Sequence, residues 1–218
     1  MHSATHQTAQ LPKLAFEVES AEAVQFAAAP TVAFTLRLSS DRPVRSLALN
    51  TQIRIAPARR RYSARDQERL VELFGPPERW GEALRTFRWH QQGAFVPPFE
   101  SSTSVELAVP CTYDLEVATA KYFYALDEGD VPLEFLFSGT VFYVDETGGL
   151  QAAQIPWECE AAYRMPVRAW RDAIENHFAG SAWLRLRDDV FDRLVAYKAQ
   201  RALPTWEATI DELLEGRE

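Results

Sequence analysis

Hydrophobic and polar residues alternate along much of the first 165 residues. A period of two predicts strands with one buried and one solvated face, and it favours antiparallel sheets, since parallel strands tend to be apolar on both faces. The segments with this pattern are 14–18, 32–38, 47–55, 105–117, 131–137, 140–144, 150–155 and 157–163. Residues 39–43 are short and polar, so they predict a hairpin between the second and third strands. Pro110 lies inside the fourth segment and predicts an edge strand or a bulge there.

Helical periodicity occurs in two places, once between the predicted strands and again at the C-terminal end of the chain. Ser63 is a good N-cap for a helix over 64–74, with Leu70, Val71 and Phe74 on one face. We expect a second helix over 78–89 and an irregular link over 93–99. Lys121–Leu126 fits either a strand or a helix. The C-terminal pattern predicts helices over 167–178 and 186–201, and a short one capped by Thr205.

These elements predict an α+β fold: a curved antiparallel sheet or a sandwich, with two inserted helices and a helical C-terminal subdomain. We expect residues 1–12 to be a disordered tail and residues 13–218 to form a single domain. Short amphipathic helices bury too little area to be stable by themselves, so we expect the C-terminal helices to pack on the sheet, mainly through Trp170.

Composition narrows the class of protein. The chain has 218 residues with 47% hydrophobic and 25% charged residues, as in ordinary globular proteins. It lacks an apolar run of about 18 residues, and its first ten residues do not read as a secretory signal. Two distant cysteines do not form a disulfide framework. We therefore expect a soluble cytoplasmic protein without a cofactor, of unknown oligomeric state.

Charge is distributed unevenly. The formal net charge is −8, yet residues 37–88 carry 12 Arg against 6 acidic residues, and residues 99–160 carry 12 acidic residues against Lys121 alone. A nucleic-acid-binding protein would normally be basic, so this class is disfavoured. The split fits an oriented surface for a protein partner, although solvated faces also drift in charge.

The run Arg59-Arg60-Arg61-Tyr62 is the strongest local candidate for a binding site. Adjacent like charges repel unless an anion is close. The anion is a phosphate, an acidic partner or the acidic half of the chain itself, and the sequence leaves all three open.

Catalytic and metal motifs are absent from the sequence. It contains no nucleophile elbow, glycine-rich phosphate loop or metal-ligand spacing. Cys111 and Cys159 lie on the apolar side of their strands, so we expect buried, reduced and inert thiols. Carboxylate pairs such as Asp114 with Glu116 fit solvated strand faces. A small-molecule pocket or hydrolase site lined by Tyr113, Asp114, Lys121 and Trp157 is the alternative.

Several short stretches together resemble an uncharacterised domain-of-unknown-function family of high-GC bacteria. They are 27–31 (AAAPT), 59–62 (RRRY), 73–75 (LFG), 79–80 (RW), 109–114 (VPCTYD), 120–123 (AKYF), 137–140 (FSGT), 155–157 (IPW) and 166–171 (PVRAWR). The resemblance extends over residues 14–214. It implies a gene beside those for nickel–iron hydrogenases and an accessory or assembly role, but no catalytic residue. We therefore expect a non-enzymatic chaperone-like or scaffold protein whose partner is a hydrogenase-related redox enzyme.

Overall fold

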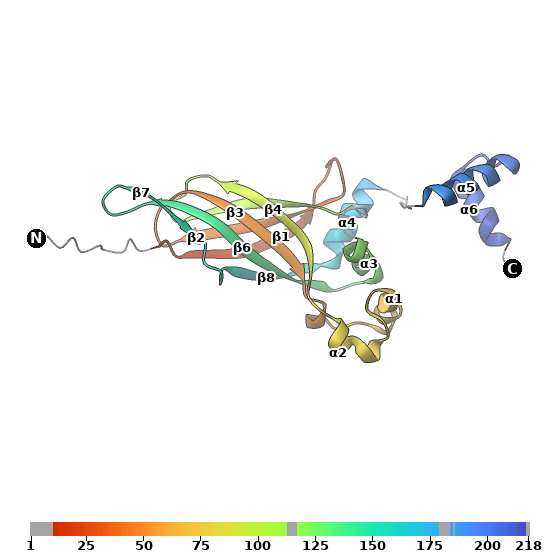
Figure 1. Ribbon diagram of the computed structural model, residues 1–218, viewed down its shortest axis with the longest axis horizontal. Coiled ribbons are helices and arrows are strands. Elements are labelled where there is room, and N and C mark those ends of the chain that lie inside the picture. Colours follow the sequence, from red (N-terminus) through yellow and green to blue (C-terminus); the bar gives the residue numbers. More distant parts are fainter. Residues whose placement is uncertain (1–10, 113–116, 179–183, 185, 217–218) are drawn as a thin grey trace, which may run out of the picture. The chain divides into compact units, whose positions relative to one another are not determined.

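The computed structural model describes residues 11–112, 117–178, 184 and 186–216, and divides the chain into two compact units, 1–179 and 180–218. The larger unit contains all the described strands (Figure 1). Two residues of the expected tail belong to the folded unit, since Leu11 packs against the core and Pro12 is buried. The remainder of that tail lies outside the described residues.

The larger unit is built from two antiparallel sheets. The first contains β1 (Leu14–Ala23), β2 (Thr31–Ser40) and β5 (Ser102–Pro110), in the order β1-β2-β5. The second has the order β4-β3-β6-β7, with β8 also paired to β6. Its strands are β3 (Val44–Ile55), β4 (Phe87–Val96), β6 (Asp130–Val144), β7 (Leu150–Gln154) and β8 (Glu160–Pro166). The α+β class is confirmed, and of the two predicted arrangements the sandwich is present.

The sandwich core lies between the inner faces of the two sheets. Phe34 on β2 contacts Trp89, Phe135 and Tyr163 of the second sheet through edge-to-face rings. Phe16 on β1 stacks on Phe137 with ring centroids 4.2 Å apart. The predicted alternation holds in β3, where Leu47, Leu49, Thr51, Ile53 and Ile55 are all buried. Aromatic contacts of this kind add packing energy beyond the apolar area that they bury.

β6 is a single strand of 15 residues where the sequence predicted two. Gly139 lies at the expected break with a φ of +130°, and a Cβ there would lie 1.9 Å from the carbonyl oxygen of Ala48. Glycine therefore permits the close approach of β3, and the strand continues past it.

Three local predictions are wrong. Residues 39–43 are not a hairpin, because β2 and β3 belong to different sheets and Val44 instead bridges to Phe99. The predicted helix over 78–89 shrinks to η2 (Pro77–Arg79) and α2 (Trp80–Ala83), and β4 begins at Phe87. The strand predicted over 105–117 is shorter, because β5 ends at Pro110 and Val117 begins helix α3 (Val117–Ala125). Of the two states left open for the segment that begins at Lys121, the helix is present. Turn residues and short amphipathic patterns do not specify which strand pairs with which, because that depends on distant segments.

Helix α1 (Ala64–Phe74) follows the prediction at its ends. Ser63 and Asp66 form a reciprocal capping box, and Gly75 ends the helix with a φ of +74°. Its buried face differs from the prediction, since Leu70 is buried whereas Val71 is largely exposed. A short turn, η1 (Pro57–Arg59), joins β3 to this helix.

Helix α4 (Val167–His177) packs on β1 and β2, as predicted for the first C-terminal helix. Trp170 is buried and stacks on Phe123 of α3 with centroids 5.2 Å apart. In Figure 1, α1, α2, α3 and α4 gather at one end of the sandwich, and β7 lies toward the other end.

The smaller unit contains α5 (Asp188–Gln200) and α6 (Trp206–Glu215), which contact each other. Thr205 caps α6 by accepting a hydrogen bond from the backbone N–H of Ala208, as predicted. Phe191 and Trp206 pack with ring centroids 5.5 Å apart. The prediction that this segment and the sandwich unfold as one domain stays a prediction.

Candidate functional site: an arginine-lined hollow

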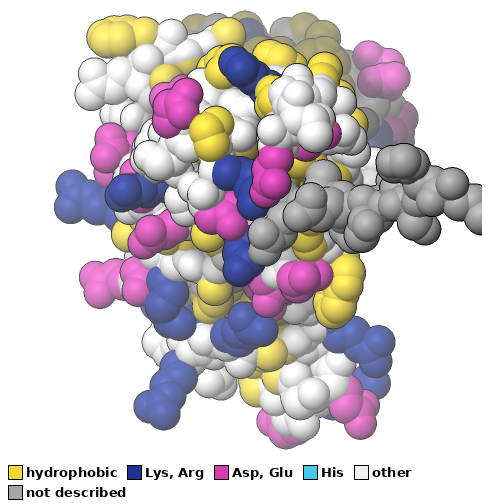
Figure 2. Space-filling view, turned by 90° about the vertical axis from the view of Figure 1, so that its left-hand side faces the viewer, with side chains coloured by type: hydrophobic (Ala, Val, Ile, Leu, Met, Phe, Trp, Pro, Cys, Tyr) yellow, Lys and Arg dark blue, Asp and Glu magenta, His cyan; other side chains and the backbone are white. Residues whose placement is uncertain are grey.

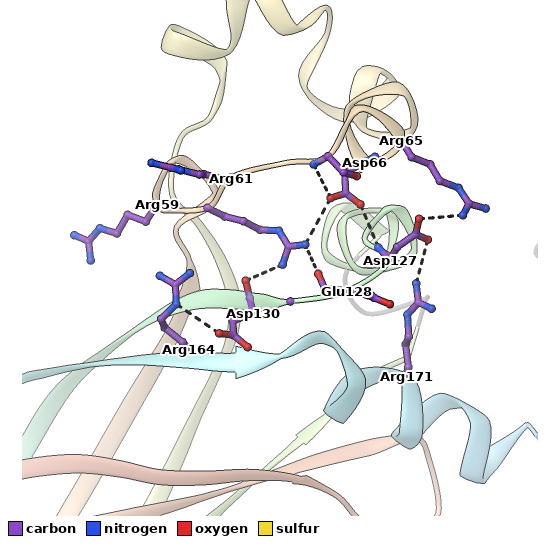
Figure 3. Close-up of a pocket in the computed structure, with 12 residues that line it drawn as sticks. Arg59, Arg61, Arg65, Asp66, Asp127, Glu128, Asp130, Arg164 and Arg171 are labelled. Atoms are coloured by element: carbon purple, nitrogen blue, oxygen red, sulfur yellow. Dashed lines mark hydrogen bonds and ion pairs between the residues drawn. The ribbon is translucent and has the colours of Figure 1, made fainter.

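A large open hollow lies at the end of the sandwich where the helices gather (Figure 3). Its volume is about 1120 Å³. It is lined by charged side chains and small polar residues: Arg59, Arg60, Arg61, Ser63, Arg65, Asp66, Asp127, Glu128, Gly129, Asp130, Arg164 and Arg171. The arginine run therefore meets the acidic segment that follows α3. Of the three anions that the sequence left open, the acidic half of the chain is present beside the run.

Arg60 is the internal member of the run. Its side chain is 6% exposed and lies 3.7 Å from the carboxylate of Asp66, which is 5% exposed. Its guanidinium also donates to the carbonyl oxygens of Asp130, at 2.7 Å, and Glu128. Gly129 has a φ of +83°, and a Cβ added there would lie 3.5 Å from this guanidinium. A left-handed glycine at that position favours the turn that places both carbonyl groups on Arg60.

Asp66 links helix α1 to the loop after α3. Its carboxylate accepts hydrogen bonds from the backbone N–H groups of Ser63 and Asp127, each at 3.1 Å. Together, Arg60 and Asp66 bind the insert between β3 and β4 to the segment that leads into β6. We call these two residues the clamp.

Asp127 is a second electrostatic centre. It accepts from Arg69 at 2.6 Å, and Arg65 and Arg171 lie 3.2 and 3.7 Å away. Desolvation raises the pKa of this carboxyl, but the hydrogen bond from Arg69 and the neighbouring positive charges lower it more strongly, so that it lies below its usual value. The Arg171 guanidinium also donates to the carbonyl oxygen of Leu126.

Tyr62 makes internal contacts. Its hydroxyl donates to the carbonyl oxygen of Pro57 at 2.8 Å and lies 2.9 Å from the hydroxyl of Tyr122. Burial raises the pKa of both phenols, so both are neutral at ordinary pH. The ring of Tyr62 packs edge-on against Trp80 of α2, below the guanidinium of Arg60.

Four arginines of the hollow are exposed: Arg59, Arg61, Arg65 and Arg164. Arg65 pairs with Asp127, whereas the other three lie on the side of Figure 3 away from Asp127. Arg59 is 63% exposed and pairs with Glu134 at 2.9 Å. Arg164 is 60% exposed and only loosely paired with Asp130, at 3.7 Å. Arg61 forms no ion pair with any residue that the structure describes. At the end of the sandwich away from the helices, basic and acidic side chains intermix on the surface (Figure 2).

The alternative pocket predicted from the sequence has less support. Tyr113 and Asp114 lie outside the described residues. Lys121 pairs with Glu72 and lines a smaller hollow of about 240 Å³ between α1 and α3. Trp157 is 91% exposed in the loop between β7 and β8 and lines neither hollow.

Both cysteines are free thiols, as predicted. Cys111 is buried, and burial raises its pKa to about 12. Cys159 is only partly buried, which corrects the prediction for this residue, because it lies in the turn before β8 and not within the strand. Burial and the charge of Glu158 raise the Cys159 pKa as well. Neither thiol has the depressed pKa of an activated nucleophile.

Within the described ranges, no group of three His, Cys, Asp or Glu side chains is placed to hold a metal ion. None of the helices in those ranges is both long and apolar enough to cross a bilayer.

A profile of a family of unknown function, DUF6084, matches residues 11–218. The chain belongs to the DUF6084 family. The match confirms the resemblance to a domain of unknown function. A comparison with curated protein sequences gives no match.

Solved structures similar to this DUF6084 chain share little sequence with it. A CARDB domain of a Pyrococcus furiosus protein, solved in complex with di-metal ions, is 9% identical at a TM-score of 0.28; 71% of this chain and 91% of that chain are covered. A Kluyveromyces marxianus β-glucosidase is 7% identical at a TM-score of 0.29, with 71% of this chain and 15% of that chain covered. Thermotoga neapolitana β-glucosidase 3B is 10% identical at a TM-score of 0.25, with 70% of this chain and 17% of that chain covered. Scores this low carry no inference about function.

The sequence pattern identified the arginine run but not Arg164 and Arg171, the two other arginines that line the hollow from distant parts of the chain. Both lie more than 100 residues from the run. The sequence did contain a signal for the acidic side of the hollow, because an excess of arginine in one segment of the chain is matched by an excess of acidic residues in another.

Proposed function

We propose that this protein is a non-enzymatic accessory or assembly protein that binds an acidic segment of a partner protein in the arginine-lined hollow. The observation that carries the proposal is the exposed group Arg59, Arg61 and Arg164 at a hollow where six arginines face four carboxylates. Guanidinium groups bind carboxylates through paired hydrogen bonds, which suits Asp and Glu side chains.

The character of the hollow favours a peptide over a small ligand. Small-molecule sites are mostly apolar and occupy about 300–1000 Å³. This hollow is larger, about 1120 Å³, and its lining is almost wholly charged. A surface of this kind selects partners by charge and register more than by apolar burial. The hydrogenase-related redox enzyme implied by the family resemblance is the first partner class to examine.

Binding of a fluorescein-labelled peptide rich in Glu and Asp, followed by anisotropy, tests the proposal. The triple variant Arg59→Gln, Arg61→Gln, Arg164→Gln is expected to bind at least about tenfold more weakly, because each charge-assisted contact contributes roughly 1.5–3 kcal/mol. The matched control is Arg37→Gln, Arg45→Gln, Arg79→Gln, which removes the same charge from exposed positions outside the hollow. The control is expected to bind nearly as well as the native protein.

Equal weakening by both triple variants would show attraction to overall charge and contradict the proposal. Displacement of the peptide by millimolar inorganic phosphate would instead indicate a small-anion site. Affinity purification of the tagged protein from its native host, with mass spectrometry and the hollow triple variant as control, then identifies the partner.

A further inference from the structure

The outer face of the second sheet lacks charge over a wide area. Its solvent-facing side chains come from β3, β4, β6 and β7 and lie in register across the sheet. They are Ser46, Ala48, Asn50, Gln52, Gln91, Gly93, Phe95, Leu136, Ser138, Thr140, Phe142, Ala152 and Gln154. We call these residues the neutral face. None is ionisable, in a chain where 25% of residues are charged.

Hydrogen bonds confirm that these side chains share one surface. Asn50 donates to the hydroxyl of Ser138 at 3.2 Å, and Gln91 donates to the amide oxygen of Asn50 at 3.4 Å. Charge borders the neutral face on the side of the hollow, where Glu160 of β8 lies opposite Leu136 and, in the next row, Arg54 lies opposite Glu134.

One exposed aromatic side chain belongs to the neutral face, and a second is in a loop next to β6. Phe95 on β4 is 71% exposed. Trp157 is in the loop that runs alongside β6, where Ile155 and Cys159 make backbone hydrogen bonds to Gly139 and Phe137. Aromatic residues are enriched and charged residues depleted at the centres of protein interfaces.

We propose that the neutral face is a homodimer interface on which a second copy of this chain packs about a twofold axis. Primary amides carry donors and acceptors together, so a patch of Asn and Gln can pair with itself across such an axis. A charged patch cannot, because twofold symmetry brings like charges together. In a chain of net charge −8, the neutral face is a surface where self-association avoids that repulsion.

The size of the neutral face predicts a weak dimer. Four strands at about 4.8 Å spacing and four rows at about 7 Å give a footprint of roughly 540 Å², against about 800 Å² per partner in a standard interface. We therefore expect concentration-dependent association, and not an obligate dimer.

Sedimentation velocity over about a hundredfold range of concentration tests the proposal. The native protein is expected to shift from monomer to dimer. Ala48→Lys sets two lysines near the axis and is expected to weaken dimerisation at least tenfold. Ala108→Lys, the same change on an exposed residue of β5 in the other sheet, is the control and is expected to leave it unchanged. Circular dichroism checks the folding of both variants.

A monomer at every concentration overturns the proposal, as does equal dimerisation of the native protein and Ala48→Lys. Phe191→Lys separates this interface from association through the exposed apolar residues of α5 and α6. Loss of the dimer in Phe191→Lys but not in Ala48→Lys overturns it too.

Discussion

Replacing Arg60 with Met tests the division of the arginine run into a structural and an exposed part. The substitution keeps a long apolar stem but removes the guanidinium from Asp66 and from the carbonyl oxygens of Glu128 and Asp130. Breaking a buried pair by removing one partner typically costs about 3–5 kcal/mol, because the other charge stays buried. Asp66 retains two backbone N–H donors, so we expect a loss near the lower end, about 3 kcal/mol.

The assay is thermal unfolding followed by circular dichroism. For a unit of this size, 1 kcal/mol shifts Tm by about 2–4 °C, so Arg60→Met is expected to lower Tm by roughly 6–12 °C. Arg61→Met is the matched control. It removes the same group from the adjacent exposed position and is expected to change stability by less than about 0.5 kcal/mol.

A double-mutant cycle separates the clamp from general loss of packing. Asp66→Asn removes the uncompensated carboxylate, so adding it to Arg60→Met is expected to cost less than the sum of the two single changes. Equal Tm losses in Arg60→Met and Arg61→Met, or strict additivity in the cycle, would refute the assignment of Arg60 to an internal clamp.

Three further outcomes are expected. Trp170→Ala removes the stack on Phe123 and is expected to cost about 3–5 kcal/mol, or roughly 10 °C in Tm, whereas Trp157→Ala at an exposed position should change Tm little. The native chain should show one transition if both units unfold as one domain; two transitions would contradict that prediction. The pKa of Asp127 is depressed in the folded state, so its stabilisation is full above the unfolded value of about 3.9 and is lost as pH falls through the folded value. Asp127→Asn is therefore expected to be less stable than the native protein at neutral pH, with the difference shrinking below about pH 4; a difference constant with pH would contradict this.

The sequence by itself was enough to predict local order. Strict alternation identified β3 and the start of β2, since the buried residues of a strand recur every second position whatever it pairs with. Ser63 and Thr205 marked the starts of α1 and α6, because a cap depends on hydrogen bonds within one turn. Trp170 was correctly expected in the core, since burial of so large an apolar surface is strongly favoured.

Tertiary structure decided what the same patterns left ambiguous. Residues 87–96 read as the end of a helix and a loop, yet they form β4, because β3 offers them an unpaired edge. The sequence offers no reason to separate the four adjacent residues 59–62. In the structure, Arg60 and Tyr62 make internal contacts, whereas Arg59 and Arg61 are exposed. That difference depends on where the chain places Asp66, Glu128 and Asp130 around each side chain. Charge and hydrogen-bonding capacity are properties of the residue, whereas the free energy of exposing or burying them depends on groups that only the fold brings within a few ångströms.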